Sequence, residues 1–129
     1  MSITKTIELI PNINCLTPAT HEEIQYRENV LDLKFTSEYK EYLLKYGVIW
    51  FDDHEITGIC NGKRLDVMVV TKDEKNMNPF VPNEWYVIET LDIDGIVIWQ
   101  SPSGEIYQSF PNGTLILYAD SLEEYIKNL

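Results

Sequence analysis

The sequence predicts an α+β fold, in which an antiparallel meander of about five to six strands carries helices packed on one face. Two observations lead to this fold class. Two segments place apolar side chains on one stripe of a helix; these are Tyr39, Tyr42, Leu43 and Tyr46 in the first and Leu122, Tyr125, Ile126 and Leu129 in the second. Between them, apolar segments of strand length are joined by short links rich in turn residues, which connect antiparallel neighbours.

The first residues, 1–17, are interpreted as an N-terminal extension or a short helix. Three isoleucines at helical spacing precede Pro11, which would end such a helix. A second helix is predicted from Thr20 to about Leu31, because Thr20 and Glu23 match a capping box. The whole chain has 129 residues, the length of one domain with its own core.

The segment around the first apolar stripe is predicted to be a sharply bounded helix. Thr36 fits the N-cap position, and Glu38 falls in the first turn, where the helix dipole favours a negative charge. Lys45 falls in the last turn, at the spacing of an ion pair with Glu41. Gly47 can adopt the positive φ that ends a helix, so the chain should pass directly from this helix into a strand.

Two short strands are predicted next, Val48–Phe51 and Glu55–Ile59, separated by the acidic turn Asp52–His54. Asn61–Gly62 is a strong turn dipeptide. The segment Leu65–Asn76 is ambiguous from its residues alone. Its four consecutive apolar residues suit a buried strand, whereas its length and polar second half also suit a helix.

Four further strands are predicted in the second half of the chain: Trp85–Thr90, Ile96–Gln100, Glu105–Ser109 and Thr114–Tyr118. In the link Ser101–Gly104, Pro102 falls where a type I turn needs a preset φ and Gly104 where it needs a positive one. Pro111–Gly113 forms another link. The remaining link is Asp92–Gly95. The last helix is predicted to begin at Asp120, with Glu123 as its capping partner.

The charge balance restricts the kind of partner. The chain has 10 Lys and Arg against 21 Asp and Glu, a net charge of −11. Residues 1–75 hold 13 acids and 9 bases, a net of −4, whereas residues 76–129 hold 8 acids and one base, a net of −7. Nucleic acid and anionic membranes bind positive surfaces, so neither is expected as a partner. The charge suits a basic protein partner, although solubility alone also explains an acidic surface.

Nothing in the sequence predicts export or insertion into a membrane. No apolar run has the length of a membrane-spanning helix, and the N-terminus lacks the apolar core and cleavage site of a signal peptide. We therefore expect a cytoplasmic protein. Cys15 and Cys60 are far apart in the sequence and are expected to be free thiols.

The sequence shows no convincing constellation for catalysis. Asp52–Glu55 resembles a metal-binding cluster, but neighbouring strand residues point to opposite sides and a zinc site needs ligands from elsewhere. Cys60 with His54 lacks a third orienting group, and Asp92 with Asp94 carries little weight as a carboxylate pair in so acidic a chain. We therefore predict no catalytic, cofactor-binding or metal-binding residue, and no enzyme activity.

Three blocks of the sequence occur in a recognisable order. The first, residues 18–47, has an acidic residue, Glu28, near the end of its first helix and a second helix that ends at glycine. The second, residues 85–108, contains the pattern Gly-x-Ile-Tyr from Gly104. The third, residues 118–129, is a closing helix. In this order they resemble the SUKH superfamily, which includes a yeast regulator of cell-wall assembly and bacterial immunity proteins that neutralise polymorphic toxins.

The chain departs from that family at two places. Phe35–Thr36 stands where the family usually has Leu-Pro, and Tyr46 precedes Gly47 where asparagine is common. The resemblance nevertheless implies a single SUKH-like domain over residues 1–129, and it favours a helix over Leu65–Asn76.

The resemblance also implies a function. It indicates an immunity protein that binds and blocks a basic toxin domain, such as a nuclease, by occluding it with an acidic surface. The alternative is a general protein-interaction or regulatory module of the same fold without a toxin partner. The predicted partner-binding residues are Asp52, Asp53, Glu55, Glu89, Asp92, Asp94, Trp99 and Glu105.

Overall fold

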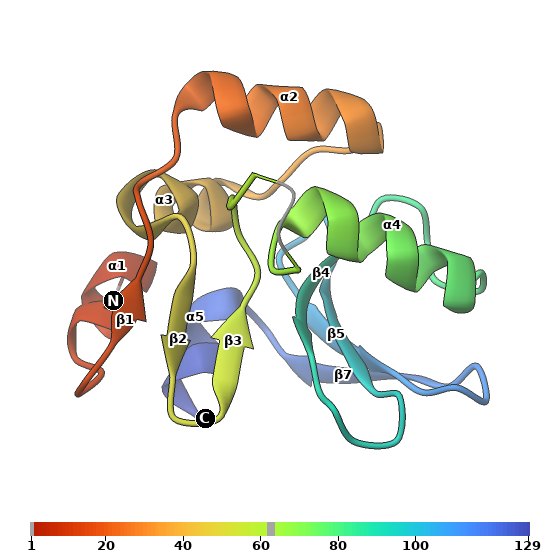
Figure 1. The fold of residues 1–129 in the computed structure, drawn as a ribbon. Coiled ribbons are helices and arrows are strands. Elements are labelled where there is room, and N and C mark those ends of the chain that lie inside the picture. Colours follow the sequence, from red (N-terminus) through yellow and green to blue (C-terminus); the bar gives the residue numbers. More distant parts are fainter. Residues whose placement is uncertain (1, 62–63) are drawn as a thin grey trace.

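The structure, a computed structural model, describes residues 2–61 and 64–129 (Figure 1). Its helices are α1 Ile3–Glu8, α2 His21–Leu31, α3 Ser37–Tyr46, α4 Val67–Met77 and α5 Leu122–Lys127. Its strands are β1 Asn14–Cys15, β2 Ile49–Phe51, β3 His54–Ile56, β4 Tyr86–Thr90, β5 Val97–Gln100, β6 Ile106–Ser109 and β7 Leu115–Ala119. Within the described ranges, no helix is both long and apolar enough to cross a lipid bilayer. Gly62 of the predicted Asn61–Gly62 turn lies outside these ranges.

The strands form two antiparallel sheets, and the predicted α+β class is confirmed. The smaller sheet has the order β1-β2-β3, and the larger is the meander β4-β5-β6-β7. The described strands therefore number seven, against the five to six predicted. The sheets meet where the Thr57 N–H donates to the Ile88 carbonyl at 2.8 Å. The N-terminal residues form the short helix α1, one of the two possibilities considered.

The main core lies between α3, α5 and one face of the larger sheet. All four residues of the α3 stripe are buried, as predicted, and pack with Ile88, Ile98 and Ile106 of the sheet. The second stripe is buried at Leu122, Tyr125 and Ile126 but not at Leu129, which is 40 % exposed because α5 ends two residues before it. The N-cap of α5 is Ser121 rather than Asp120, since the Ser121 hydroxyl accepts the Glu124 N–H.

A second core lies on the opposite face of the meander. It contains Trp85, Val87, Val97 and Trp99, with Val70 of α4 packed against them. The ambiguous segment is thus a helix, as the resemblance favoured. Its position corrects the prediction that helices cover one face only, because α4 covers the face that α3 and α5 leave open (Figure 1).

The boundaries of α3 follow the sequence prediction. The Thr36 hydroxyl accepts the Tyr39 N–H, and Gly47 has φ 72°. The Val48 N–H returns to the Tyr46 carbonyl at 2.8 Å, which makes a γ-turn at Gly47. Lys45 pairs with Glu8 of α1 rather than with the predicted Glu41, so it joins two helices instead of supporting one.

Two glycines allow three backbone segments, at Thr17, Gly47 and Gly58, to lie close together at the end of α3. A Cβ added to Gly58 would lie 1.6 Å from the Gly47 carbonyl oxygen, and one added to Gly47 would lie 2.1 Å from the Thr17 oxygen. The Ile59 N–H donates to the Gly47 carbonyl at 3.0 Å. Only glycine fits such an approach, which holds β3 beside the end of α3.

Candidate protein-binding surface

Two acidic turns from different sheets lie at the same end of the molecule. The turn between β2 and β3 contains Asp52 and Asp53, and the link between β4 and β5 contains Asp92 and Asp94; all four are exposed. Hydrogen bonds place the start of β3 beside the end of β4, since the Glu55 N–H donates to Glu89 at 3.3 Å. Both turns lie at the bottom of the view in Figure 1. We call Asp52, Asp53, Asp92 and Asp94 the acidic rim.

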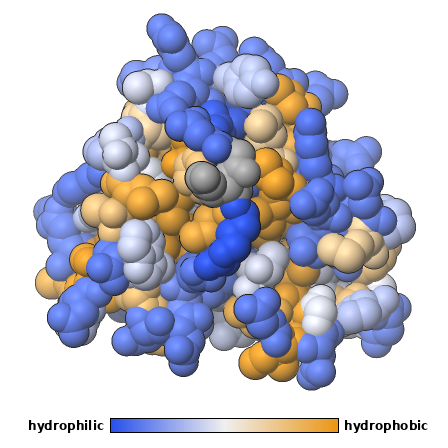
Figure 2. Space-filling model, viewed as in Figure 1, coloured by the Kyte–Doolittle hydropathy of each residue, from blue (hydrophilic) through white to orange (hydrophobic). Residues whose placement is uncertain are grey.

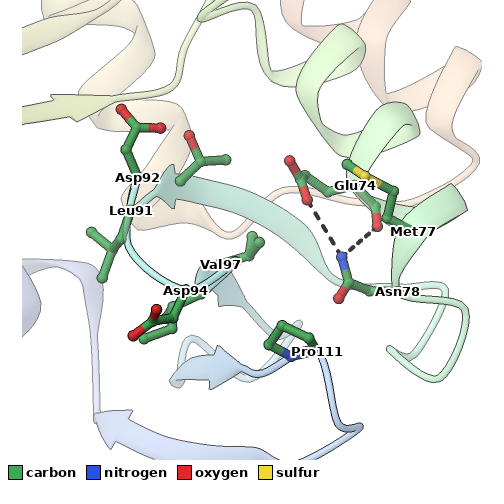
Figure 3. Close-up of a pocket in the computed structure, with 11 residues that line it drawn as sticks. Glu74, Met77, Asn78, Leu91, Asp92, Asp94, Val97 and Pro111 are labelled. Atoms are coloured by element: carbon green, nitrogen blue, oxygen red, sulfur yellow. Dashed lines mark hydrogen bonds between the residues drawn. The ribbon is translucent and has the colours of Figure 1, made fainter.

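A pocket of about 530 Å³ opens beside the β4–β5 link. Glu74, Met77 and Asn78 from the end of α4 line one side, and Asp92 and Asp94 line the other (Figure 3). The Asn78 side-chain amide donates to the Glu74 carbonyl at 2.8 Å and to its carboxylate at 3.4 Å, which holds the α4 side of the pocket in place.

The electrostatics of the pocket favour a positive group. Its described lining includes three carboxylates, those of Glu74, Asp92 and Asp94, and no Lys or Arg. Partial burial raises the pKa of Glu74, and the negative charge of Asp73 adds to this shift. The C-terminal end of α4 contributes the negative end of its dipole. Such a lining accepts a guanidinium or ammonium group better than an anion.

Exposed apolar side chains flank the same pocket. Met77 is 67 % exposed at the end of α4, and Ile93 is 63 % exposed between Asp92 and Asp94. In the view of Figure 2, hydrophilic side chains cover much of the lower boundary and hydrophobic patches interrupt them. Apolar anchors beside complementary charge are typical of protein-binding surfaces. Glu74, Met77 and Ile93 were not among the predicted contacts, although Met77 and Ile93 are apolar residues between polar neighbours.

Glu55 contributes less free charge than predicted. Arg64 donates to its two carboxylate oxygens at 2.8 and 2.5 Å. These hydrogen bonds lower the pKa of Glu55 and raise the pKa of Arg64, with a smaller contribution to Arg64 from the charge of Asp92. Arg64 therefore neutralises Glu55 beside the acidic rim and also lies within reach of the charge of Asp92.

Glu89 is not a surface residue, which corrects one predicted partner contact. It is 2 % exposed. Its carboxylate accepts the Tyr125 hydroxyl at 2.5 Å, and His54 Nδ1 lies 3.0 Å from its other oxygen. Burial and the charge of Glu89 raise the pKa of Tyr125. The register of β4 against β5 shifts by one residue before Glu89, and this bulge turns its side chain into the main core.

Two other predicted contacts also lie away from the acidic rim. Trp99 is fully buried in the second core, where its indole N–H donates to Ser109 at 2.8 Å, so it cannot serve as an exposed anchor. Glu105 is partly exposed but follows the β5–β6 turn, at the opposite end of β5 from Asp94, and accepts hydrogen bonds from Ser103 and Tyr107. The predicted residues therefore do not form one continuous patch.

The residues considered for chemistry occupy structural positions. His54 is held by Glu89 rather than by Cys60. Within residues 2–61 and 64–129, no group of three or more His, Cys, Asp and Glu side chains is placed to hold a metal ion. Cys15 and Cys60 are not joined to each other by a disulfide.

Fold and surface together define a small α+β protein with a candidate acidic surface for binding another protein. Residues 2–129 match the model of the family SUKH_5, described as SMI1-KNR4 cell-wall. The chain belongs to this family, which confirms the resemblance to the SUKH superfamily. The superfamily includes toxin immunity proteins, and its members are typically immunity or regulatory proteins rather than enzymes. A comparison with curated proteins found no match.

Proposed function

We propose that this protein is a cytoplasmic immunity protein that binds a toxin domain and blocks it by occlusion. The observation that carries the proposal is the acidic rim with its pocket, a negative surface built from two sheets and the end of α4. A nuclease domain, whose substrate site must be positive to bind nucleic acid, is the partner whose charge such a surface complements best.

The proposed contact has an electrostatic part and an apolar part. A basic side chain of the toxin enters the pocket between Glu74 and the β4–β5 link, while Met77 and Ile93 pack against apolar side chains around it. The exposed charges accelerate the encounter, and the anchored side chain slows dissociation.

The test is the association rate with a candidate toxin domain, taken from the genes beside this one and measured over a range of salt concentrations. Asp92→Asn with Asp94→Asn should lower the association rate and flatten its salt dependence, because two exposed charges are removed from the acidic rim. Glu22→Gln with Glu41→Gln removes two exposed charges from α2 and α3 instead, and should change the rate little. Equal rates for both double variants would show that the toxin docks elsewhere.

A regulatory interaction module of the same fold remains the alternative, because an acidic surface also suits a basic partner that is not a toxin. Co-production in cells distinguishes the two. An immunity protein restores growth of cells that make the neighbouring toxin, and Asp92→Asn with Asp94→Asn weakens this protection. A regulatory module gives no protection at any expression level.

A further inference from the structure

In the part of the chain that the structure describes, the larger sheet has one open edge, at β7. Its other edge strand, β4, is covered by β3 through the Thr57–Ile88 hydrogen bond and the Glu89 contacts. Strand β7 pairs with β6, and no other strand among residues 2–61 and 64–129 pairs with it. The backbone of an open edge is a template for a further strand.

The side chains of β7 carry no charge, and the one protective feature of this strand is a bulge at Tyr118, where its register against β6 shifts. Ile116, Leu117 and Tyr118 are consecutive and are 48, 50 and 50 % exposed. Residues 106–119 contain no Asp, Glu, Lys or Arg, in a chain of net charge −11. Soluble proteins normally place charged residues or proline on an exposed edge strand, and neither occurs within β7.

The hydrogen-bond pattern shows which backbone groups point outwards. The Phe110 N–H donates to the Thr114 carbonyl at 3.0 Å, and the register pairs Gln108 with Ile116. Hydrogen-bonded pairs alternate with non-bonded pairs along an antiparallel ladder, so Ile116 bonds to β6. The N–H and C=O groups of Leu115 and Leu117 therefore point to the open edge.

We propose that β7 pairs with β7 of a second copy of this chain, antiparallel and about a two-fold axis at Ile116. In this register, Leu115 of one copy exchanges hydrogen bonds with Leu117 of the other, and Ile116 meets Ile116 of the second copy. Thr114 lies opposite Tyr118. Both strands use backbone groups that already point outwards, and the two meanders join into one continuous sheet.

The uncharged stretch around β7 is where a second copy of so acidic a chain is repelled least. Two chains of net charge −11 repel each other over most of their surfaces. Glu105 and Asp120 bound the uncharged stretch 106–119, so the self-paired segments of β7 place no carboxylate opposite another. An isologous contact of this kind closes after two copies and leaves the acidic rim outside the paired edge.

The test is the molecular mass of the full chain in sedimentation velocity at micromolar concentration, where a specific dimer of ordinary affinity persists. We expect the unmodified chain to sediment at twice the monomer mass. Ile116→Lys places two positive charges at the two-fold axis and should give a monomer. Leu9→Lys, at the apolar C-cap residue of α1 that is 71 % exposed, is the matched control and should remain dimeric.

A second variant tests the backbone contact directly. Leu117→Pro removes an outward N–H but no hydrogen bond to β6, so it should also give a monomer with an unchanged circular dichroism spectrum. A monomeric unmodified chain would overturn the proposal. This holds also if the monomer pairs its β7 with a strand of a different protein. So would a dimer that both variants leave intact. No toxin is needed for this measurement, so its result is independent of the proposed function.

Discussion

At the scale of single residues, the contact that should cost the most stability when broken is a buried ion pair between α2 and α4. Arg27 Nε and Nη2 lie 2.9 and 2.8 Å from Asp66 Oδ1, and Asp66 is 0 % exposed. Asp66 also accepts the Cys60 and Met68 N–H groups, so it caps α4 as well. One carboxylate thus fixes α2, α4 and the preceding loop relative to one another.

Removing one partner should be costly because it leaves the other charge buried. Arg27→Met should lower the free energy of unfolding by about 3–5 kcal/mol, measured by urea denaturation. Arg64→Met breaks the exposed pair with Glu55 and is the matched control; it should cost less than about 1 kcal/mol. Similar losses for the two variants would show that the Arg27 pair contributes no more than a surface contact.

A second residue-scale prediction concerns backbone crowding at Gly58. Gly58→Ala should destabilise the protein well beyond the about 1 kcal/mol of a typical substitution, because its Cβ would meet the Gly47 oxygen at 1.6 Å. Gly104→Ala is the control. Gly104 has φ 96° but no atom within 4 Å of an added Cβ, so that variant carries only the cost of its backbone conformation. Urea denaturation of both variants separates crowding from φ strain.

At the scale of elements, α3 packs against α1, α2 and α5 and against the larger sheet. Leu43→Ala should lower the free energy of unfolding by about 2–5 kcal/mol, the range for a fully buried leucine. Leu9→Ala, at an exposed position, should change it by less than about 0.5 kcal/mol. A loss below about 1 kcal/mol for Leu43→Ala would mean that α3 does not hold the core together.

Local signals predicted the elements better than the contacts between them. The Thr36 and Thr20 caps and the turns ending at Gly104 and Gly113 were predictable because each depends on neighbouring residues. Glu38 was assigned only to the first turn of α3. In the structure its carboxylate also accepts the N–H groups of Leu122 and Glu123, at 2.9 Å each, and so caps α5. No local pattern reveals a partner 84 residues away.

The candidate surface was predictable only in part for a similar reason. Asp92 and Asp94 lie in a turn that the sequence makes evident, and they are exposed as expected. Regular alternation along β4 would place the Glu89 side chain on the other face of the sheet. The bulge in β4 reverses this, and the sequence carries no sign of that bulge. The pocket was not predictable, because Glu74 reaches it only through the packing of α4 on the sheet.

At the scale of the whole molecule, the net charge of −11 should make stability depend on salt. Self-repulsion among exposed carboxylates destabilises the compact state at low ionic strength, and salt screens it. The melting temperature should therefore rise when sodium chloride is added to a low-salt buffer. Asp92→Asn with Asp94→Asn should reduce this rise more than Glu22→Gln with Glu41→Gln does, if the acidic rim concentrates the repulsion. Calorimetric melts of the three proteins provide the comparison.

The contact between α1 and α5 has a consequence for the order of folding. Ile3 and Ile7 share the main core with Leu122, Tyr125 and Ile126, so the first helix packs on the last one. During synthesis α1 emerges early, but its partner appears only after the whole meander has been made. Until then the α3 stripe lacks part of the core that buries it. Closing contacts across so long a separation slows folding, and the unfinished chain exposes apolar surface that chaperones recognise.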